Sequence, residues 1–282
     1  WYPTLYEGQE CSPNCIYTGA VPNQQQKDFI PWLVKTYGKR FYLVGSNYVY
    51  PKVENNVCKI LLKELGGEVL GEEYFPLGHS EFSSVIQRFK ETKPDVIFST
   101  VDGDSVVALM RQYKTAGFDP HKVPMASLTT SEEEVQATGG EFAAGNLTSA
   151  PYFMSVDTPE NHKFVDAYRN RWGKNQLTNF VSEAAYFQVF LFKKAVENLH
   201  GKDITPPNIR EASWNQTFQA PQGLVKIDPE NSNTYLWPKI GEVQPDGQFK
   251  IIQQSKEWVE PLPYWPLKGE KCTPTGLVTT KS

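Results

Sequence analysis

The chain has 282 residues, enough for two domains or one large one, and its 39% hydrophobic content is typical of a globular protein with a buried core. Its formal charge of −4 and the lack of a dense Lys/Arg cluster argue against a phosphate-binding stripe, so we expect no nucleic-acid partner. No apolar run approaches the roughly 20 residues needed to cross a bilayer.

Strands and helices alternate in the first half of the chain. The expected strands are short runs of β-branched and aromatic residues, and the expected helices carry apolar residues at helical spacing. In chain order we expect strand 15–20, helix 25–38, strand 40–46, helix 53–67, strand 68–77, helix 80–94, strand 95–100, helix 103–117, strand 123–130 and helix 131–140. This βα repeat predicts an α/β fold with a doubly wound parallel sheet.

The alternation weakens after residue 150. Two amphipathic helices are expected over 158–173 and 181–201, with no strand of comparable quality between them. A hairpin is expected within 235–254, because a Pro-Asp-Gly turn there separates two alternating strands. The two helices need a sheet to pack on, so we expect part of a second lobe to lie upstream of Trp1.

The stretch from Phe41 to Pro51 ends a predicted interior strand in two tyrosines, Tyr48 and Tyr50. Open α/β sheets bind ligands at the carboxyl ends of their strands. Gly45 is expected to turn the chain outward, and Pro51 fits the start of the next helix. The two phenols therefore either cap the core or line a ligand cleft.

Two further predicted strands end in polar residues that face the same edge. Asp102 follows one of these strands, and Thr129 and Ser131 follow the other. Asp102 and Ser131 can each be a helix N-cap instead, and we favour that interpretation for Ser131. A carboxylate at Asp102 can alternatively accept an amide N–H from a ligand.

The cysteine count is even, and four cysteines allow three full pairings. Cys58 shares a helical face with leucines and is expected to be a small buried hydrophobe, and Cys15 lies in an apolar run. Cys11 and Cys272 lie in polar surroundings and are the expected disulfide. The spacing of the four does not indicate a zinc site.

Catalysis has little support in these residues. None of the four histidines has a nucleophile or metal-ligand spacing, and the Gly-Ser turn at 45–46 lacks the second glycine of a nucleophile elbow. We therefore expect no enzyme, no cofactor and no metal.

Motifs along the whole chain resemble the amide- and urea-binding branch of the type I periplasmic binding proteins, which includes urea ABC transporter subunits and the amide sensor of the amidase operon. The motifs are "WYPTLYEGQECSPN", "YTGAVPNQQ", "YLVGSNYVYP", "FPLGHSEF", "ASLTTSEEEV", "VDTPEN", "SEAAY" and "APQGLVKI". The Gly-Asp-Ser turn at 103–105 is closer to the transporter subunits, and 126–132 is closer to the sensor.

The resemblance implies a two-lobe type I periplasmic binding protein fold with doubly wound parallel sheets, closing on a ligand between the lobes. The first lobe is expected to be incomplete in this chain. The implied division is 1–20 and 152–225 for the remainder of lobe I, and 21–151 and 226–282 for lobe II. The implied crossovers between the lobes are 19–25, 149–154 and the region around 223–230.

The resemblance also implies a ligand site at the strand ends of both lobes. The implied ligand-binding residues are Tyr2 and Thr4 on one wall, Tyr48 and Tyr50 on the facing wall, and Asp102 and Thr129 at neighbouring strand ends. A phenol suits a small neutral ligand, because its O–H can donate to a carbonyl while its ring excludes water. The expected ligand is urea or a short-chain aliphatic amide.

By this resemblance the protein captures its ligand in the periplasm and delivers it to a membrane ABC permease. One alternative is a ligand-sensing protein, either a cytoplasmic regulator or the extracellular domain of a receptor. An oxidised Cys11–Cys272 pair would exclude a purely cytoplasmic regulator. The other alternative, an amidase or other hydrolase, needs a nucleophile and a base that these residues do not supply.

Overall fold

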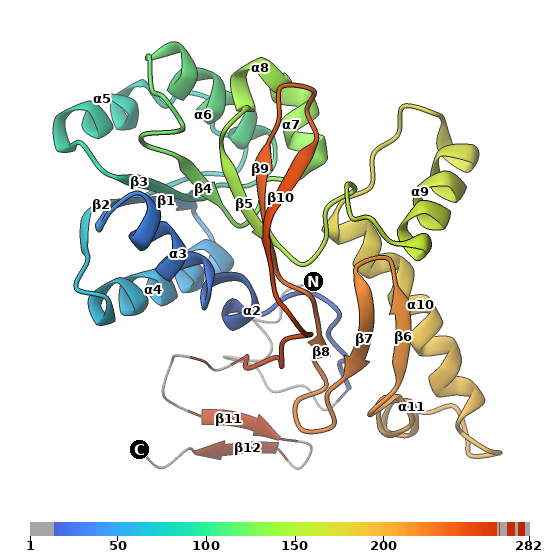
Figure 1. Cartoon of the computed structure of the whole chain (residues 1–282). Coiled ribbons are helices and arrows are strands. Elements are labelled where there is room, and N and C mark those ends of the chain that lie inside the picture. The colour runs from blue at the N-terminus through green and yellow to red at the C-terminus, as the bar shows by residue number, and fades with distance from the viewer. Residues whose placement is uncertain (1–13, 264, 266–269, 274–275, 280–282) are drawn as a thin grey trace.

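The computed structural model describes residues 14–263, 265, 270–273 and 276–279, and its largest element is a seven-stranded sheet. The sheet order is β10-β9-β5-β4-β3-β1-β2 (Figure 1). Its strands are β1 (Arg40–Ser46), β2 (Glu68–Phe75), β3 (Val96–Thr100), β4 (Met125–Ser127), β5 (Leu147–Ala150), β9 (Lys239–Val243) and β10 (Phe249–Gln254). Strands β1 to β5 are parallel, whereas the predicted hairpin adds β9 and β10 antiparallel.

Helices cover both faces of this sheet (Figure 1), which confirms the predicted doubly wound α/β fold. The helices of this part are α2 (Pro22–Gln26), α3 (Phe29–Thr36), α4 (Val49–Glu64), α5 (Ser83–Thr92), α6 (Asp104–Thr115), α7 (Glu132–Thr138) and α8 (Gly140–Ala143). Phe41 and Leu43 of β1 pack in one apolar cluster with α3 and α4, and Tyr42 and Val44 pack in the other with α5 and α6. Strand β1 is therefore apolar on both faces, as interior parallel strands are.

A second body lies beside the seven-stranded sheet (Figure 1). It contains α9 (Pro159–Trp172), α10 (Phe180–Glu197), α11 (Pro206–Ser213) and a three-stranded antiparallel sheet of β6 (Thr217–Ala220), β7 (Gly223–Ile227) and β8 (Thr234–Tyr235). The two predicted helices are confirmed as α9 and α10. Near the carboxyl end, β11 (Glu270–Thr273) pairs with β12 (Gly276–Thr279).

The three strands β6 to β8 were not expected, because they are short and only partly apolar. Strand β7 spans the predicted lobe boundary at residue 225, and β8 pairs with it. The predicted division into lobe segments stays a prediction.

The strand expected over 15–20 does not form. The backbone N–H of Tyr17 donates to the Ser232 carbonyl at 2.9 Å, and the Thr234 hydroxyl donates to the Tyr17 carbonyl at 2.7 Å. Ala20 is buried in the core of the second body, and Ile16 packs against it. The apolar residues that indicated a strand thus belong to an irregular segment that packs on the second body.

The single helix expected over 25–38 is split into α2 and α3. Pro31 has no N–H to donate to the Lys27 carbonyl, and its ring crowds that carbonyl, so a continuous helix is interrupted there. Helix α3 begins at Phe29, which places Pro31 in its first turn, where proline is tolerated. None of the helices in the described ranges combines the length and hydropathy that crossing a bilayer requires.

Candidate functional site

Three neighbouring parallel strands, β1, β3 and β4, end at the same edge of the large sheet. Tyr48 follows β1, Asp102 follows β3 and Thr129 follows β4. These three residues and Tyr50 line one pocket of about 240 Å³. The other residues that line it are Leu77, Gly103, Leu128, Glu134, Phe180 and Val181. The structure therefore brings together four of the six predicted site residues.

The other two predicted ligand-binding residues, and one cysteine of the predicted disulfide, lie outside the described part of the chain. Tyr2 and Thr4 belong to the undescribed first residues, and so does Cys11, the expected partner of Cys272. The Cys11–Cys272 disulfide stays a prediction. The other two cysteines carry free thiols, and Cys58 is fully buried in α4 as predicted.

A close approach at Gly45 positions the two tyrosines. A Cβ atom on Gly45 would lie 2.6 Å from Thr100 Oγ1 and 2.9 Å from Pro51 Cβ, so only glycine fits. Gly45 lies inside β1, so the expectation that it turns the chain outward was wrong. Helix α4 begins at Val49, before the predicted start, and Tyr50 lies in its first turn.

Tyr48 and Asp102 form a hydrogen-bonded pair inside the pocket. The Tyr48 hydroxyl donates to Asp102 Oδ2 at 2.5 Å, and the Asp102 backbone N–H donates to Ser46 Oγ at 3.0 Å. Burial raises the pKa of the Asp102 carboxyl to about 6, so it is mostly ionised at pH 7. The helix N-cap after β3 is Gly103, and the Asp102 carboxylate instead faces Tyr48. In this structure the Tyr48 O–H is aimed at Asp102, whereas the sequence interpretation aimed it at a ligand carbonyl.

Thr129 holds the loop that follows β4. Its hydroxyl donates to the Val101 carbonyl at 2.6 Å, and its backbone N–H donates to Ser127 Oγ at 3.1 Å. Ser131 is the N-cap of α7, as expected, and its backbone N–H donates to Glu134 Oε2 at 2.8 Å. Glu134 therefore reaches the pocket from a fixed position in the first turn of α7.

Sequence reasoning missed Gln25, which lies behind the pocket. The Tyr50 hydroxyl donates to Gln25 Oε1 at 3.3 Å, and Gln25 is 3% exposed. The signal that could have found it is the run of three glutamines at 24–26 after Pro22, because all three are buried although their side chains are polar. Buried amides need specific partners.

The electrostatics of the pocket are acidic. Asp102 and Glu134 are its charged lining residues, and no lysine or arginine is among the described residues that line it. The arrangement can accept hydrogen bonds from N–H groups, but it offers no cation to a carboxylate. Within the described ranges, no group of three or more His, Cys, Asp or Glu side chains is placed to hold a metal ion.

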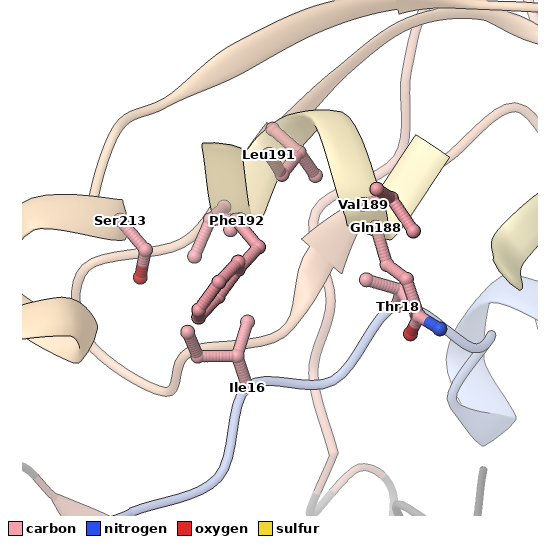
Figure 2. A pocket seen from close by; sticks show the side chains of 8 residues that line it. Ile16, Thr18, Gln188, Val189, Leu191, Phe192 and Ser213 are labelled. Carbon is pink, nitrogen blue, oxygen red and sulfur yellow. The ribbon is translucent and has the colours of Figure 1, made fainter. Parts of the chain in front are cut away.

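A larger and more apolar cavity of about 350 Å³ lies in the second body (Figure 2). It is lined by Ile16, Thr18, Gln188, Val189, Leu191, Phe192, Ser213 and Ile227. At its wall, the Thr18 hydroxyl donates a hydrogen bond to Gln188 Oε1 at 3.3 Å. Without a titratable group at its wall, this cavity offers less recognition chemistry than the strand-end pocket.

The doubly wound α/β fold with a pocket at its strand ends agrees with the sequence comparison. A model of the periplasmic binding protein domain matches residues 1–269. The chain belongs to this family. The predicted type I periplasmic binding fold is therefore confirmed, although the family match does not single out the amide and urea branch.

Relatives within this family span more residues than this chain. The chain is 30% identical over 205 residues to Leu/Ile/Val-binding protein homolog 6 of Brucella suis, covering 70% of this chain and 52% of that protein. It thus spans about half the length of such curated relatives. Two Rhodopseudomonas palustris solute-binding proteins of ABC transporters superpose well. The complex with benzoate has a TM-score of 0.80 at 18% identity, and the complex with 4-hydroxybenzoate has 0.77 at 25% identity. They cover 91% of this chain and 69% and 70% of theirs.

Proposed function

We propose that this protein is the periplasmic solute-binding component of an ABC transporter and that it captures urea or a short-chain aliphatic amide. Family membership and the fold support the transport role. The observation that carries the ligand class is the strand-end pocket, where Tyr48, Tyr50, Asp102 and Thr129 meet and the charged residues are acidic. The ligand is then passed to a membrane permease, and no chemical step is involved.

A small neutral amide fits this wall better than a carboxylate does. An amide N–H donates to the Asp102 carboxylate and to the phenol oxygens. A carboxylate bound here would be desolvated beside Asp102 and Glu134, and an unpaired buried charge is very costly. The benzoate and branched-chain amino-acid ligands named for similar proteins would need a cation that this wall does not offer.

The direct test is a thermal-shift screen of the intact protein against urea, formamide, acetamide, leucine, benzoate and 4-hydroxybenzoate. We expect urea or an amide to raise the melting temperature, because a ligand that binds only the native state stabilises it. Leucine and the two benzoates should produce much smaller shifts. A large shift with leucine or a benzoate, and none with urea or the amides, would contradict the proposal.

The carboxylate of Asp102 should control affinity. We expect Asp102→Asn to weaken amide or urea binding by about tenfold or more, because hydrogen bonds to charged groups contribute about 1.5–3 kcal/mol. Wild-type affinity should fall as the pH is lowered from 7 to 5, since the Asp102 carboxyl, with a pKa of about 6, then takes up a proton.

Isothermal titration at pH 5, 6 and 7 measures both effects. The Asn variant should lose this pH dependence. Asp166→Asn, on the exposed face of α9, is the matched control and should leave affinity and its pH dependence unchanged. An Asp102→Asn variant that binds with wild-type affinity at all three pH values would show that the carboxylate does not contact the ligand.

A further inference from the structure

We propose that Gln25 is a positioning residue that fixes the direction of the Tyr50 hydroxyl, so that the pocket presents acceptors and selects ligands rich in N–H donors. This inference rests on the proposed function and names the chemical property by which that same site chooses its ligand. It assigns a binding role to a residue of α2 that does not itself line the pocket.

Two backbone carbonyls determine which end of the Gln25 amide faces which neighbour. Gln25 Nε2 donates to the Leu128 carbonyl at 3.2 Å and to the Ser149 carbonyl at 3.5 Å. A carbonyl can only accept, so this end of the side chain must be the NH₂ group. The other end is then the carbonyl oxygen, and Tyr50 must be the donor in the 3.3 Å hydrogen bond between them.

Gln25 is held too firmly to reverse this arrangement. The residue is 3% exposed, and its own backbone carbonyl accepts a hydrogen bond from Ser149 Oγ at 2.7 Å. Turning the amide over would point the NH₂ group at the Tyr50 hydroxyl and leave two carbonyls opposite an oxygen. Because unpaired buried polar groups are costly, the direction seen here is the stable one.

The consequence reaches the ligand through both tyrosines. The Tyr50 proton is committed to Gln25, and the Tyr48 proton is directed at Asp102. The two rings stack with centroids 6.4 Å apart and planes at 29°. Toward a ligand, both phenol oxygens and the Asp102 carboxylate then act as acceptors. A ligand with several N–H groups matches this set, whereas a ligand without donors does not.

Acetamide and acetone make a suitable pair of probes, because they differ by an NH₂ group in place of a methyl group. We expect the wild-type protein to prefer acetamide in isothermal titration. In Gln25→Met the Tyr50 proton is released and can donate to the carbonyl of acetone, which receives no hydrogen bond from these groups in the wild type, whereas acetamide already bonds to them through its N–H groups. The acetamide-to-acetone affinity ratio should therefore fall by about fivefold or more. If Gln25 had a purely structural role, the substitution would lower the affinity for both ligands by the same factor and leave the ratio unchanged.

Two further variants make the test specific. Gln24→Met removes an equally buried glutamine of the same helix, whose Nε2 bonds to the carbonyls of Thr234 and Val259, and it should leave the ratio unchanged. Tyr50→Phe removes the same hydrogen bond from the other side and should lower the ratio. Adding Gln25→Met to Tyr50→Phe should lower it no further.

The outcomes separate this inference from the proposed function. A wild-type protein that binds acetamide in preference to acetone, with the same ratio in Gln25→Met, would overturn the role of Gln25 and leave the proposed function standing. Should Gln25→Met not fold, a wild-type ratio in Tyr50→Phe overturns the inference equally. A wild-type protein that binds neither acetamide nor urea would overturn both.

Discussion

Replacing Lys239 by methionine should lower the free energy of unfolding by about 2–6 kcal/mol. Lys239 is 2% exposed at the start of β9, and its Nζ donates to the Pro151 carbonyl at 2.8 Å and to the Trp237 carbonyl at 2.7 Å. Methionine fills nearly the same space but leaves both buried carbonyls without a donor, which costs about 1–3 kcal/mol for each. Pro151 follows β5 and Trp237 precedes β9, so this one side chain ties the two connections together.

Differential scanning calorimetry of the wild type and the variant measures this loss as a lower melting temperature. The matched control is Lys250→Met, because Lys250 lies on the neighbouring strand β10 but is exposed. A surface substitution of this kind should change stability by no more than about 0.5 kcal/mol. Equal melting temperatures for Lys239→Met and the wild type would show that the two carbonyls find other partners.

The second large effect concerns pH. Burial raises the pKa of the Glu54 carboxyl to about 8 from an ordinary 4.5, although a hydrogen bond from Gln26 Nε2 to its Oε2 opposes the shift. The native state therefore keeps this proton between pH 4.5 and 8, where the unfolded chain has lost it. Stability falls as the pH rises through that window, by up to about 1.4 kcal/mol per pH unit for this group.

Glu54→Gln removes this titration and keeps an oxygen acceptor for Gln26. The variant should gain stability relative to the wild type as the pH rises from 5 to 7. The difference between the two proteins isolates Glu54, because the other buried groups titrate in both. Glu132, whose pKa burial also raises to about 8, adds to the slope, and Lys239, whose pKa burial lowers to about 7, opposes it above pH 7.

Calorimetric melting temperatures at pH 5, 6 and 7 give the comparison without a chemical denaturant, since urea is itself a candidate ligand. Glu64→Gln is the matched control, because Glu64 lies at the exposed end of the same helix, α4. That control should follow the wild-type pH profile. Parallel profiles for Glu54→Gln and the wild type would mean that Glu54 is ionised in the native state.

The parts of the site that could be predicted are those fixed by strand order. Parallel strands end at one edge, so Tyr48, Asp102 and Thr129 could be placed together from the alternation of strands and helices alone. Gln25 and Phe180 could not, because Gln25 lies in a helix rather than at a strand end and Phe180 begins α10, outside that βα repeat. The sequence also could not predict the direction of the Tyr48 hydrogen bond, since a phenol can donate or accept.

The parts of the fold that were predicted wrongly are those where a short apolar run had two possible uses. The segment 15–20 has the composition of a strand, but its apolar side chains pack into the second body rather than onto a ladder. The break at residues 27–28 follows from Pro31 and was available in the sequence. The sheet of β6 to β8 depends on pairing between short strands, which local propensity does not determine.

The position of β9 has a consequence for the order in which the protein acquires its structure. Strand β5 ends at Ala150, and all four of its residues are buried, but its outer neighbour β9 begins only at Lys239. During synthesis the ribosome must add the whole intervening body before that edge is paired. Until then β5 offers free backbone groups to other chains, and such an unpaired edge promotes aggregation. Closing the sheet is a contact between distant parts of the chain, which makes it a slow, late step.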